Sequence, residues 1–324
     1  MQNRDVTCSS DRLCAPRQTP ARQSTRRTTQ RTTQRTTSKG SSSKSSSASN
    51  GGVTDAELKA FTEELIKIDD DNVAGLVSFD AGCSTKVGRP TDCSPDSLIT
   101  RVEDSVLKRP IYRKLQALYE NYNNDVTVVE DRTSFERAEE DQLLEEIMKS
   151  KVMIKTLEFL KSQNVFTKSA NDFKKLLKEL WFDVYSRGQS TIFFFFFIIS
   201  FLGKKILGSS GFEHVFLGEK KNGAVQGLKS CFVACFEGAL VGFHNWVYFH
   251  HLEKQNKLNY LGHWRKVDFA GRGTGLTFTF KWGQEQKPMS SMLIGTSPEF
   301  EMALYTTCIL ARSAELYLER SERG

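Results

Sequence analysis

The spacing of apolar residues separates this chain into stretches of different character. Residues 1–52 contain almost no large apolar side chain, whereas from Val53 onward apolar residues recur with a helical period of about 3.6. That helical pattern continues to about Tyr185. The pattern therefore predicts an unstructured beginning followed by a helical region.

Start signals locate four helices in this region. The first begins at a capping box made by Thr54 and Glu57, and the acidic run 69–71 ends it, which is typical of a solvated helix end rather than a cation site. The second begins at Pro110 with an aromatic stripe that favours core packing over base stacking. The third runs from a Thr133/Glu136 box to about Ser162, and the fourth is capped by Ser169. Their apolar faces contain Leu58, Phe61, Leu65 and Ile68; Tyr112, Leu115, Leu118, Tyr119 and Tyr122; Leu143, Leu144, Ile147, Val152, Ile154 and Leu157; and Phe173, Leu176, Leu177, Leu180 and Trp181.

Most of the positive charge lies in the first 52 residues. This tail carries ten Lys or Arg against two Asp, a balance of +8 that leaves −2 for the remaining 272 residues. It contains the repeat RTTQRTTQRTT and a Ser-rich run, so we predict a disordered linker; non-specific RNA binding or modification are the alternatives. Any RNA contact in the body must then come from a local patch rather than from net charge.

Two further observations concern cellular context. Residues 1–30 lack the apolar core of a signal peptide, and residues 188–203 form a Phe-rich run of 16 uncharged residues, shorter than the ~20 that a spanning helix needs. We therefore expect no stable membrane span, with a marginal anchor as the alternative. Among the seven cysteines, Cys83 and Cys93 lie in one loop and could pair, and the Cys231/Cys235 pair lacks a second ligand pair for zinc.

Two histidines stand in similar surroundings. His214 lies in GFEHVF and His244 in GFHNW, each among Gly and Phe residues on a strand-like pattern. An unperturbed imidazole titrates near pH ~6.5, so two of them brought together can move a proton on and off one substrate. His250, His251 and His263 belong to no such motif and are interpreted as surface or packing residues.

Further motifs follow in a fixed order. KPMSS begins at Lys287, and IGTSPEFEMALYTTCILAR runs from Ile294 to Arg312, with Ser297 and Pro298 typical of a helix start. Together with the two histidine motifs, this series resembles the EndoU family of uridine-preferring endoribonucleases. The resemblance covers Gly208 to about Arg312 strongly and the helical region loosely.

The resemblance implies an α+β fold. A helical lobe, residues 53–187, would support a catalytic lobe of antiparallel sheets with flanking helices, residues 206–324. The implied catalytic residues are His214 and His244 as the acid and base, in an order that spacing does not decide, and Lys287 as the electrostatic partner.

Supporting roles fall to Glu213, Glu219 and Ser291, the last of which is read either as a helix cap or as a phosphate contact. Several members of the family depend on manganese, and Glu213 and Glu219 are candidate ligands, although the ion could instead act through the RNA. The expected substrate is single-stranded RNA containing uridine, cleaved by its own 2′-hydroxyl to a 2′,3′-cyclic phosphate. We expect a monomer that does not act on DNA. Family members are often secreted, so the missing leader favours either an intracellular address or a missing start.

Two stretches interrupt the resemblance, residues 188–205 and 228–241, and we interpret both as retained intervening sequence. After Arg312 the family continues into closing strands that help to position uracil, whereas this chain continues with SAELYLERSERG. The alternative function is therefore a catalytically impaired RNA-binding protein on the same scaffold.

Overall fold

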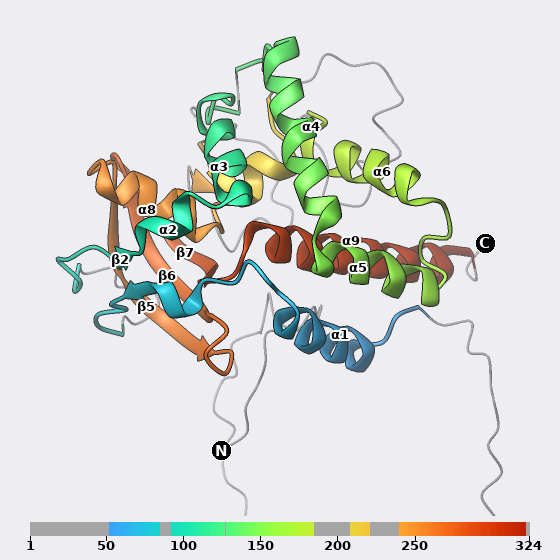
Figure 1. Cartoon of the computed structure of the whole chain (residues 1–324). Helices are drawn as coiled ribbons and strands as arrows, with labels where there is room; N and C mark the ends of the chain where they lie inside the picture. The colour runs from blue at the N-terminus through green and yellow to red at the C-terminus, as the bar shows by residue number, and fades with distance from the viewer. Residues whose placement is uncertain (1–51, 85–91, 127, 185–207, 221–239, 322–324) are drawn as a thin grey trace, which may run out of the picture.

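The computed structural model describes residues 52–84, 92–126, 128–184, 208–220 and 240–321, with side chains to residue 312 (Figure 1). The predicted tail up to residue 51, the Phe-rich run and residues 228–239 of the second insert lie outside these residues, as does the boundary between the predicted lobes, whereas the last two residues of the second insert are described. Mixed helices and antiparallel sheets confirm the α+β class.

The helical part consists of α1 (Asp55–Lys67), α2 (Asp104–Leu107), α3 (Pro110–Ala117), α4 (Ser134–Lys149), α5 (Lys151–Ser162) and α6 (Ala170–Phe182). Capping boxes start α1 at Thr54, α4 at Thr133 and α6 at Ser169, where each side-chain oxygen accepts a backbone N–H of the first turn. The aromatic stripe that begins at Pro110 is core, since Tyr112 is fully buried.

The third predicted helix is wrong in one respect, because it is two helices. Ser150 has extended backbone angles of φ −68° and ψ 147°, which end α4. Its hydroxyl then accepts the backbone N–H of Met153 and so caps α5. The break turns α5 away from α4 and lays it beside α9 (Pro298–Ser321) (Figure 1).

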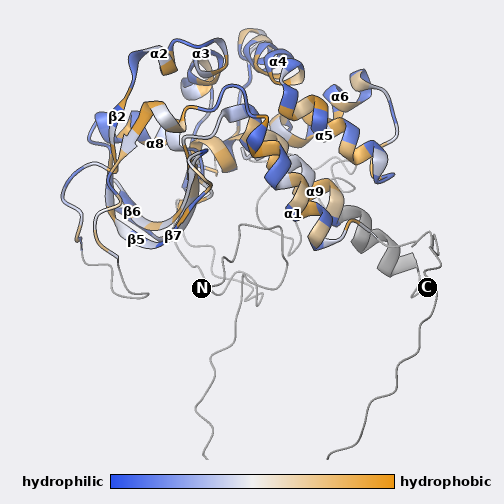
Figure 2. Cartoon of the chain, turned by 60° about the horizontal axis from the view of Figure 1, so that its bottom comes forward, coloured by the Kyte–Doolittle hydropathy of each residue, from blue (hydrophilic) through white to orange (hydrophobic). Residues whose placement is uncertain are grey.

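The main sheet contains β5 (Leu258–Asp268), β6 (Thr274–Trp282) and β7 (Glu285–Ile294), all antiparallel in that order. Two small antiparallel pairs accompany it: β1 (Val77–Phe79) with β2 (Ile99–Val102), and β3 (Glu219–Lys220) with β4 (Leu240–Val241). The sheet curves around α8 (Trp246–Lys254) in Figure 2. The ring of Phe249 on α8 meets Phe278 and Phe280 of β6 edge to face.

One continuous hydrophobic core joins the helices to the sheet. Tyr112 of α3 packs against Trp246, the first residue of α8, and Tyr119 packs against Tyr248 of the same helix. The helical part therefore holds the start of α8 in place, directly after His244.

A second link joins α1 to α9, at the place where the sequence predicted a solvated helix end. Asp69 is only 1% exposed, and its carboxylate accepts the backbone N–H of Ser297 and the side-chain amide of Asn72. The prediction is wrong for Asp69, because this residue lies beneath the start of α9, whereas Asp70 is exposed as predicted. The N-cap role predicted for Ser297 is confirmed, since its hydroxyl accepts the N–H of Phe300.

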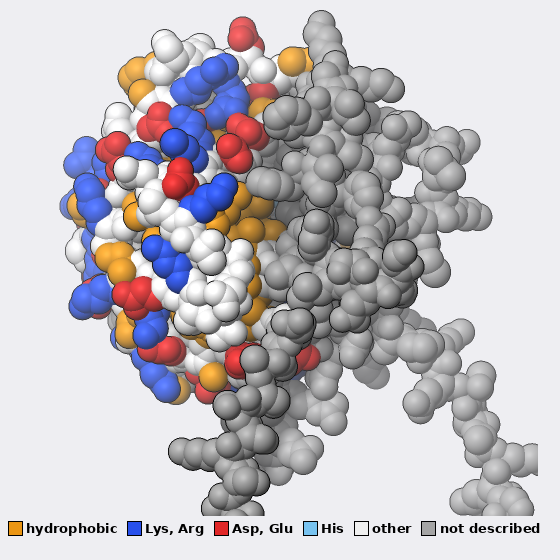
Figure 3. Space-filling model, turned by 90° about the vertical axis from the view of Figure 1, so that its right-hand side faces the viewer, with side chains coloured by type: hydrophobic (Ala, Val, Ile, Leu, Met, Phe, Trp, Pro, Cys, Tyr) orange, Lys and Arg blue, Asp and Glu red, His pale blue; other side chains and the backbone are white. Residues whose placement is uncertain are grey.

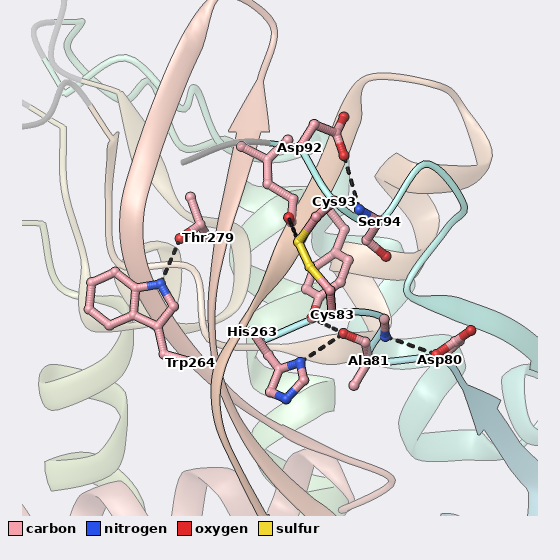
Figure 4. The surroundings of a disulfide bond; sticks show 12 residues. Asp80, Ala81, Cys83, Asp92, Cys93, Ser94, His263, Trp264 and Thr279 are labelled. Atoms are coloured by element: carbon pink, nitrogen blue, oxygen red, sulfur yellow. Dashed lines mark hydrogen bonds between the residues drawn. A yellow bond between two sulfur atoms is a disulfide. The ribbon is translucent and has the colours of Figure 1, made fainter. Parts of the chain in front are cut away.

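Described residues between β1 and β2, including Cys83, Ser84 and Cys93, lie along the outer edge of β5. Cys83 and Cys93 form a disulfide, as their spacing suggested, and the N–H of Cys93 donates to the carbonyl of Leu261 (Figure 4). His263 is tied to the carbonyl of Ala81 through Nδ1, at 2.9 Å. An otherwise open strand edge is thereby paired.

The remaining surface carries both signs of charge. The face in Figure 3 shows Lys and Arg interspersed with Asp and Glu. Ion pairs also join neighbouring helices, such as Lys178 of α6 with Asp141 of α4 and Lys155 of α5 with Glu64 of α1. Within the described part of the chain, no helix combines the length and the apolar character needed to cross a bilayer.

Candidate active site

His214 lies in a π-helical turn, Glu213–Leu217, and not on the strand that its sequence pattern suggested. Its N–H donates to the carbonyl of Ser210, and Gly218 ends the turn with a left-handed φ of 77°. Short π-helical turns of this kind are frequent at functional sites, because they redirect one side chain out of the helical repeat. Here the turn buries Val215 and Phe216 and leaves the imidazole partly exposed.

Glu219 holds the His214 ring. Its Oε2 lies 3.0 Å from Nδ1 of His214, and its Oε1 accepts the hydroxyl of Ser209. The Glu219 side chain is fully buried, whereas that of His214 is 21% exposed. A carboxylate at Nδ1 fixes the ring orientation and stabilises the imidazolium form.

His244 reaches the same place through two unusual backbone conformations. Gly242 and Phe243 have φ values of 66° and 70°, and Phe243 N–H donates to the carbonyl of His214 at 2.7 Å. The N–H of His244 then donates to the carbonyl of Val215, also at 2.7 Å. These backbone bonds set the ring centroids of His214 and His244 5.8 Å apart.

The hydrogen bond at Nδ1 also defines the tautomer of His244. Nδ1 lies 2.7 Å from the backbone carbonyl oxygen of Ser291 on β7, and a carbonyl can only accept, so Nδ1 is the donor. In the neutral ring, Nε2 therefore has the lone pair. Burial, the nearby Lys287 ammonium and His214 together lower the pKa of His244 well below its usual value.

Lys287 belongs to the same cluster. It lies on β7, and its Nζ donates to the carbonyl oxygen of Gly242. The hydroxyl of Ser290 donates to the next carbonyl, that of Phe243, at 2.9 Å. The strand thus positions an ammonium group beside the segment that carries His244.

The predicted site residues differ in how closely they gather. His214, His244, Lys287, Glu219 and Ser291 come together through the contacts above; Ser291 does so mainly through its carbonyl, and its hydroxyl is 3.4 Å from Nδ1 of His244. It caps no helix, because Ser297 has that role. Glu213 is buried on the side of the helical part, where its charge contributes to the raised pKa of Tyr122. Their catalytic roles stay predictions.

The described residues do not provide a protein site for a metal. No group of three or more His, Cys, Asp or Glu side chains within them could hold an ion. The carboxylate of Glu219 is already engaged by Ser209 and His214. The candidate manganese ligands Glu213 and Glu219 therefore do not form a fitting donor set with their described neighbours.

Sequence reasoning missed a support beneath His244. Asn245 caps α8 by accepting the N–H groups of Val247 and Tyr248, and its amide donates to the fully buried Glu301 of α9. Tyr305, one turn further along α9, places its ring 6.4 Å from that of His244. The signal was the four-residue spacing of Glu301 and Tyr305, which puts both on one helical face.

Comparisons with known proteins agree with this architecture. Residues 57–321 match the family model described as "Endoribonuclease XendoU". A "Uridylate-specific endoribonuclease" from Bos taurus is 32% identical over 272 residues, which cover 83% of this chain and 58% of the bovine protein. A "Uridylate-specific endoribonuclease D" from Xenopus laevis is 30% identical over 268 residues, covering 81% of this chain and 78% of that protein.

A solved structure described as "The structure of XendoU: a splicing independent snoRNA processing endoribonuclease" is also similar. It has a TM-score of 0.58 and 31% sequence identity, and the match covers 79% of this chain and 83% of that one. The match with the family model extends across both the helical part and the sheet. This chain belongs to the XendoU endoribonuclease family, the EndoU family that its ordered motifs resemble.

Proposed function

We propose that this protein is a uridine-preferring endoribonuclease that cleaves single-stranded RNA by attack of the 2′-hydroxyl on the adjacent phosphate. The observation that carries the proposal is the pair of imidazoles, His214 and His244, with centroids 5.8 Å apart and Lys287 beside them. Two imidazoles and one ammonium group supply a base, an acid and a cation for one phosphodiester.

His244 is the base in this scheme. Its Nδ1 donates to Ser291, so Nε2 accepts the 2′-hydroxyl proton, and the lowered pKa of His244 keeps the ring neutral at physiological pH. The 2′-oxygen forms a bond to phosphorus while the bond from phosphorus to the 5′-oxygen breaks. The products are a 2′,3′-cyclic phosphate and a 5′-hydroxyl.

His214 is the acid. The buried carboxylate of Glu219 stabilises the imidazolium, which protonates the departing 5′-oxygen. Lys287 lies where an ammonium group can stabilise the negative charge that gathers on the phosphate oxygens in the transition state. This division of roles follows from the opposite surroundings of the two rings, one facing a carboxylate and one facing an ammonium group.

The substrate range follows from this chemistry and from the relatives. DNA lacks the nucleophile, so we expect no cleavage of DNA. The preference for uridine is supported by the names of similar proteins, such as the bovine uridylate-specific endoribonuclease.

We further propose that the protein is a monomer. The described residues offer no set of metal ligands, so we propose that any stimulation by manganese acts through the RNA.

The test is cleavage of a single-stranded oligonucleotide with one uridine, assayed for cyclic-phosphate ends with and without Mn²⁺. Cleavage at the uridine, with a loss of at least ~10²-fold in His244→Ala, is the expected result. The matched control is His263→Ala. His263 lies on β5, and its imidazole is hydrogen-bonded to the carbonyl of Ala81. Equal cleavage by wild type and His244→Ala would eliminate the mechanism, and binding without any cleavage would favour the impaired RNA-binding alternative.

A further inference from the structure

Lys220 is a half-buried cation close to the proposed active site. It follows Glu219 on β3, and its Nζ lies 4.5 Å from the ring centroid of Trp282. Burial lowers the pKa of Lys220, and the charge of Glu285 opposes this effect only in part. Within the described residues Lys220 forms no salt bridge, so its charge is largely uncompensated.

The sheet relates Lys220 to Lys287. On the β6–β7 ladder Trp282 pairs with Glu285 and Phe280 pairs with Lys287. Directly paired residues project to the same face, and residues two apart on one strand do so as well. Trp282 and Lys287 therefore lie on the same face of the sheet, one step of two residues apart along the strands.

This spacing of two residues along a strand is similar to the spacing of two neighbouring phosphates in RNA. Two strand residues span about 6.6 Å, which is on the scale of the distance between neighbouring phosphates of an extended nucleic-acid strand. Trp282 also packs against Phe243, the residue before His244, with ring centroids 5.3 Å apart. An RNA chain with one phosphate bound at Lys287 can therefore bring the adjacent phosphate to Lys220.

We propose that Lys220, supported by the face of Trp282, binds the backbone phosphate next to the one that is cleaved. This inference rests on the proposed endoribonuclease function and extends it to a substrate of at least three nucleotides. The bound phosphate provides a paired counter-charge, which the described residues do not give Lys220. The Trp282 ring holds the ammonium group in place before the RNA arrives, through a cation–π contact.

The experiment compares substrates that differ only in the number of phosphates. A dinucleotide containing uridine has the scissile phosphate alone, and trinucleotides add one on the 5′ or the 3′ side. We expect Lys220→Met to leave kcat/KM on the dinucleotide within about 2-fold, and to lower it about 10-fold on at least one trinucleotide. The salt dependence on that trinucleotide should fall by about 0.7 in slope, the value for one phosphate on a single strand.

Lys281→Met is the matched control, because Lys281 is an exposed lysine on the opposite face of β6, next to Trp282. It should cause no change that depends on substrate length. An equal loss on the dinucleotide and the trinucleotides in Lys220→Met would overturn the subsite, as would no loss on either. Thermal unfolding identifies a merely structural lysine, which would lower Tm without changing the length dependence, and this result also counts against the subsite. If wild type cleaves none of the substrates, it is the proposed function that fails.

Discussion

The backbone of His244 is hydrogen-bonded to that of Val215, the residue after His214, at 2.7 Å. The two histidines are therefore positioned by main-chain contacts between residues 214–215 and residues 243–244. Gly242 makes this approach possible, because a Cβ atom there would lie 1.9 Å from the carbonyl oxygen of His214.

Gly242→Ala is accordingly expected to separate the two imidazoles. Both the left-handed φ of 66° and the collision with His214 oppose the new methyl group. A displacement of about 1 Å costs on the order of 10²-fold in rate, and we expect kcat to fall by that amount in cleavage of a uridine oligonucleotide.

The control for this variant is Gly271→Ala. Gly271 has a similar φ of 77°, but nothing lies within 4 Å of its Cβ position. Both variants should lose about 1–2 kcal/mol of stability from the left-handed backbone conformation. Gly242→Ala should lose more because of the collision with His214, and only this variant should lose activity. Equal activity in the two variants would show that the close approach at His214 is unimportant.

The pH dependence of cleavage should report the base. Lys287 lowers the pKa of His244, so removing its charge raises that pKa toward 6.5. The acid limb of kcat/KM, below which His244 is protonated and inactive as a base, should then move to higher pH in Lys287→Met. Lys281→Met should leave the limb unchanged, and a limb that stays in place in Lys287→Met would argue against His244 as the base.

The fold elements that sequence could predict are those governed by local rules. The capping boxes at Thr54 and Thr133 depend on residues three positions apart and form as predicted, and the predicted cap at Ser169 is confirmed as well. The break at Ser150 was missed because its neighbours continue the apolar helical pattern, although Ser150 caps α5 and α5 packs against α9.

The site shows the same division. The histidines and Lys287 were found through short motifs, and Glu219 through its place beside the first of them. The π-helical turn at His214 and the burial of Asp69 could not be predicted, because both depend on partners distant in sequence, such as Ser297 for Asp69. Glu301 was missed because an acidic residue in the first turn of a helix is ordinarily solvated there.

The helical part depends on a buried ion pair. Arg132 bonds both carboxylate oxygens of Glu140 and the carbonyl of Phe182, while the Tyr122 hydroxyl donates to the same carboxylate. Glu140 is fully buried, so Arg132→Met leaves a charge without its partner and should cost about 3–5 kcal/mol of unfolding free energy. Denaturant unfolding measures this.

A surface pair is the comparison for this prediction. Lys155 contacts Glu64 at 2.8 Å, but both side chains are at least a third exposed. Lys155→Met should therefore lower the free energy of unfolding far less than Arg132→Met does. If the two substitutions cost the same, the buried pair has no special structural role.

His250 makes stability depend on pH. It is 6% exposed, neither ring nitrogen has a hydrogen-bond partner among the described residues, and burial lowers its pKa to about 4. The unfolded state binds a proton near pH 6.5, so stability is lost as pH falls from about 6.5 to about 4, by about 3 kcal/mol in total.

His250→Leu should remove this loss. Burial raises the pKa of Glu253 to about 7 and gives the opposite dependence, but this contribution cancels when the two proteins are compared at each pH. The measurement is urea unfolding at pH 4.5 and at pH 7 for wild type and variant. An unchanged difference between the two pH values in His250→Leu would mean that His250 is not the titrating group.

Glu301 of α9 supports Asn245, the residue that follows His244. Glu301 accepts from the Asn245 amide at 3.2 Å and from the Thr296 hydroxyl at 3.3 Å, and burial raises the pKa of Glu301 well above its usual value. Glu301→Gln should retain an oxygen that accepts from the Asn245 amide, and it removes the titratable group. Glu301→Leu removes the acceptor and leaves the Asn245 amide unsatisfied, at a cost of about 1–3 kcal/mol. Because Asn245 follows His244, we expect kcat to fall in Glu301→Leu with KM unchanged, and Glu301→Gln to restore most of it. A variant that loses stability but keeps its kcat would show that α9 supports the fold without positioning the base.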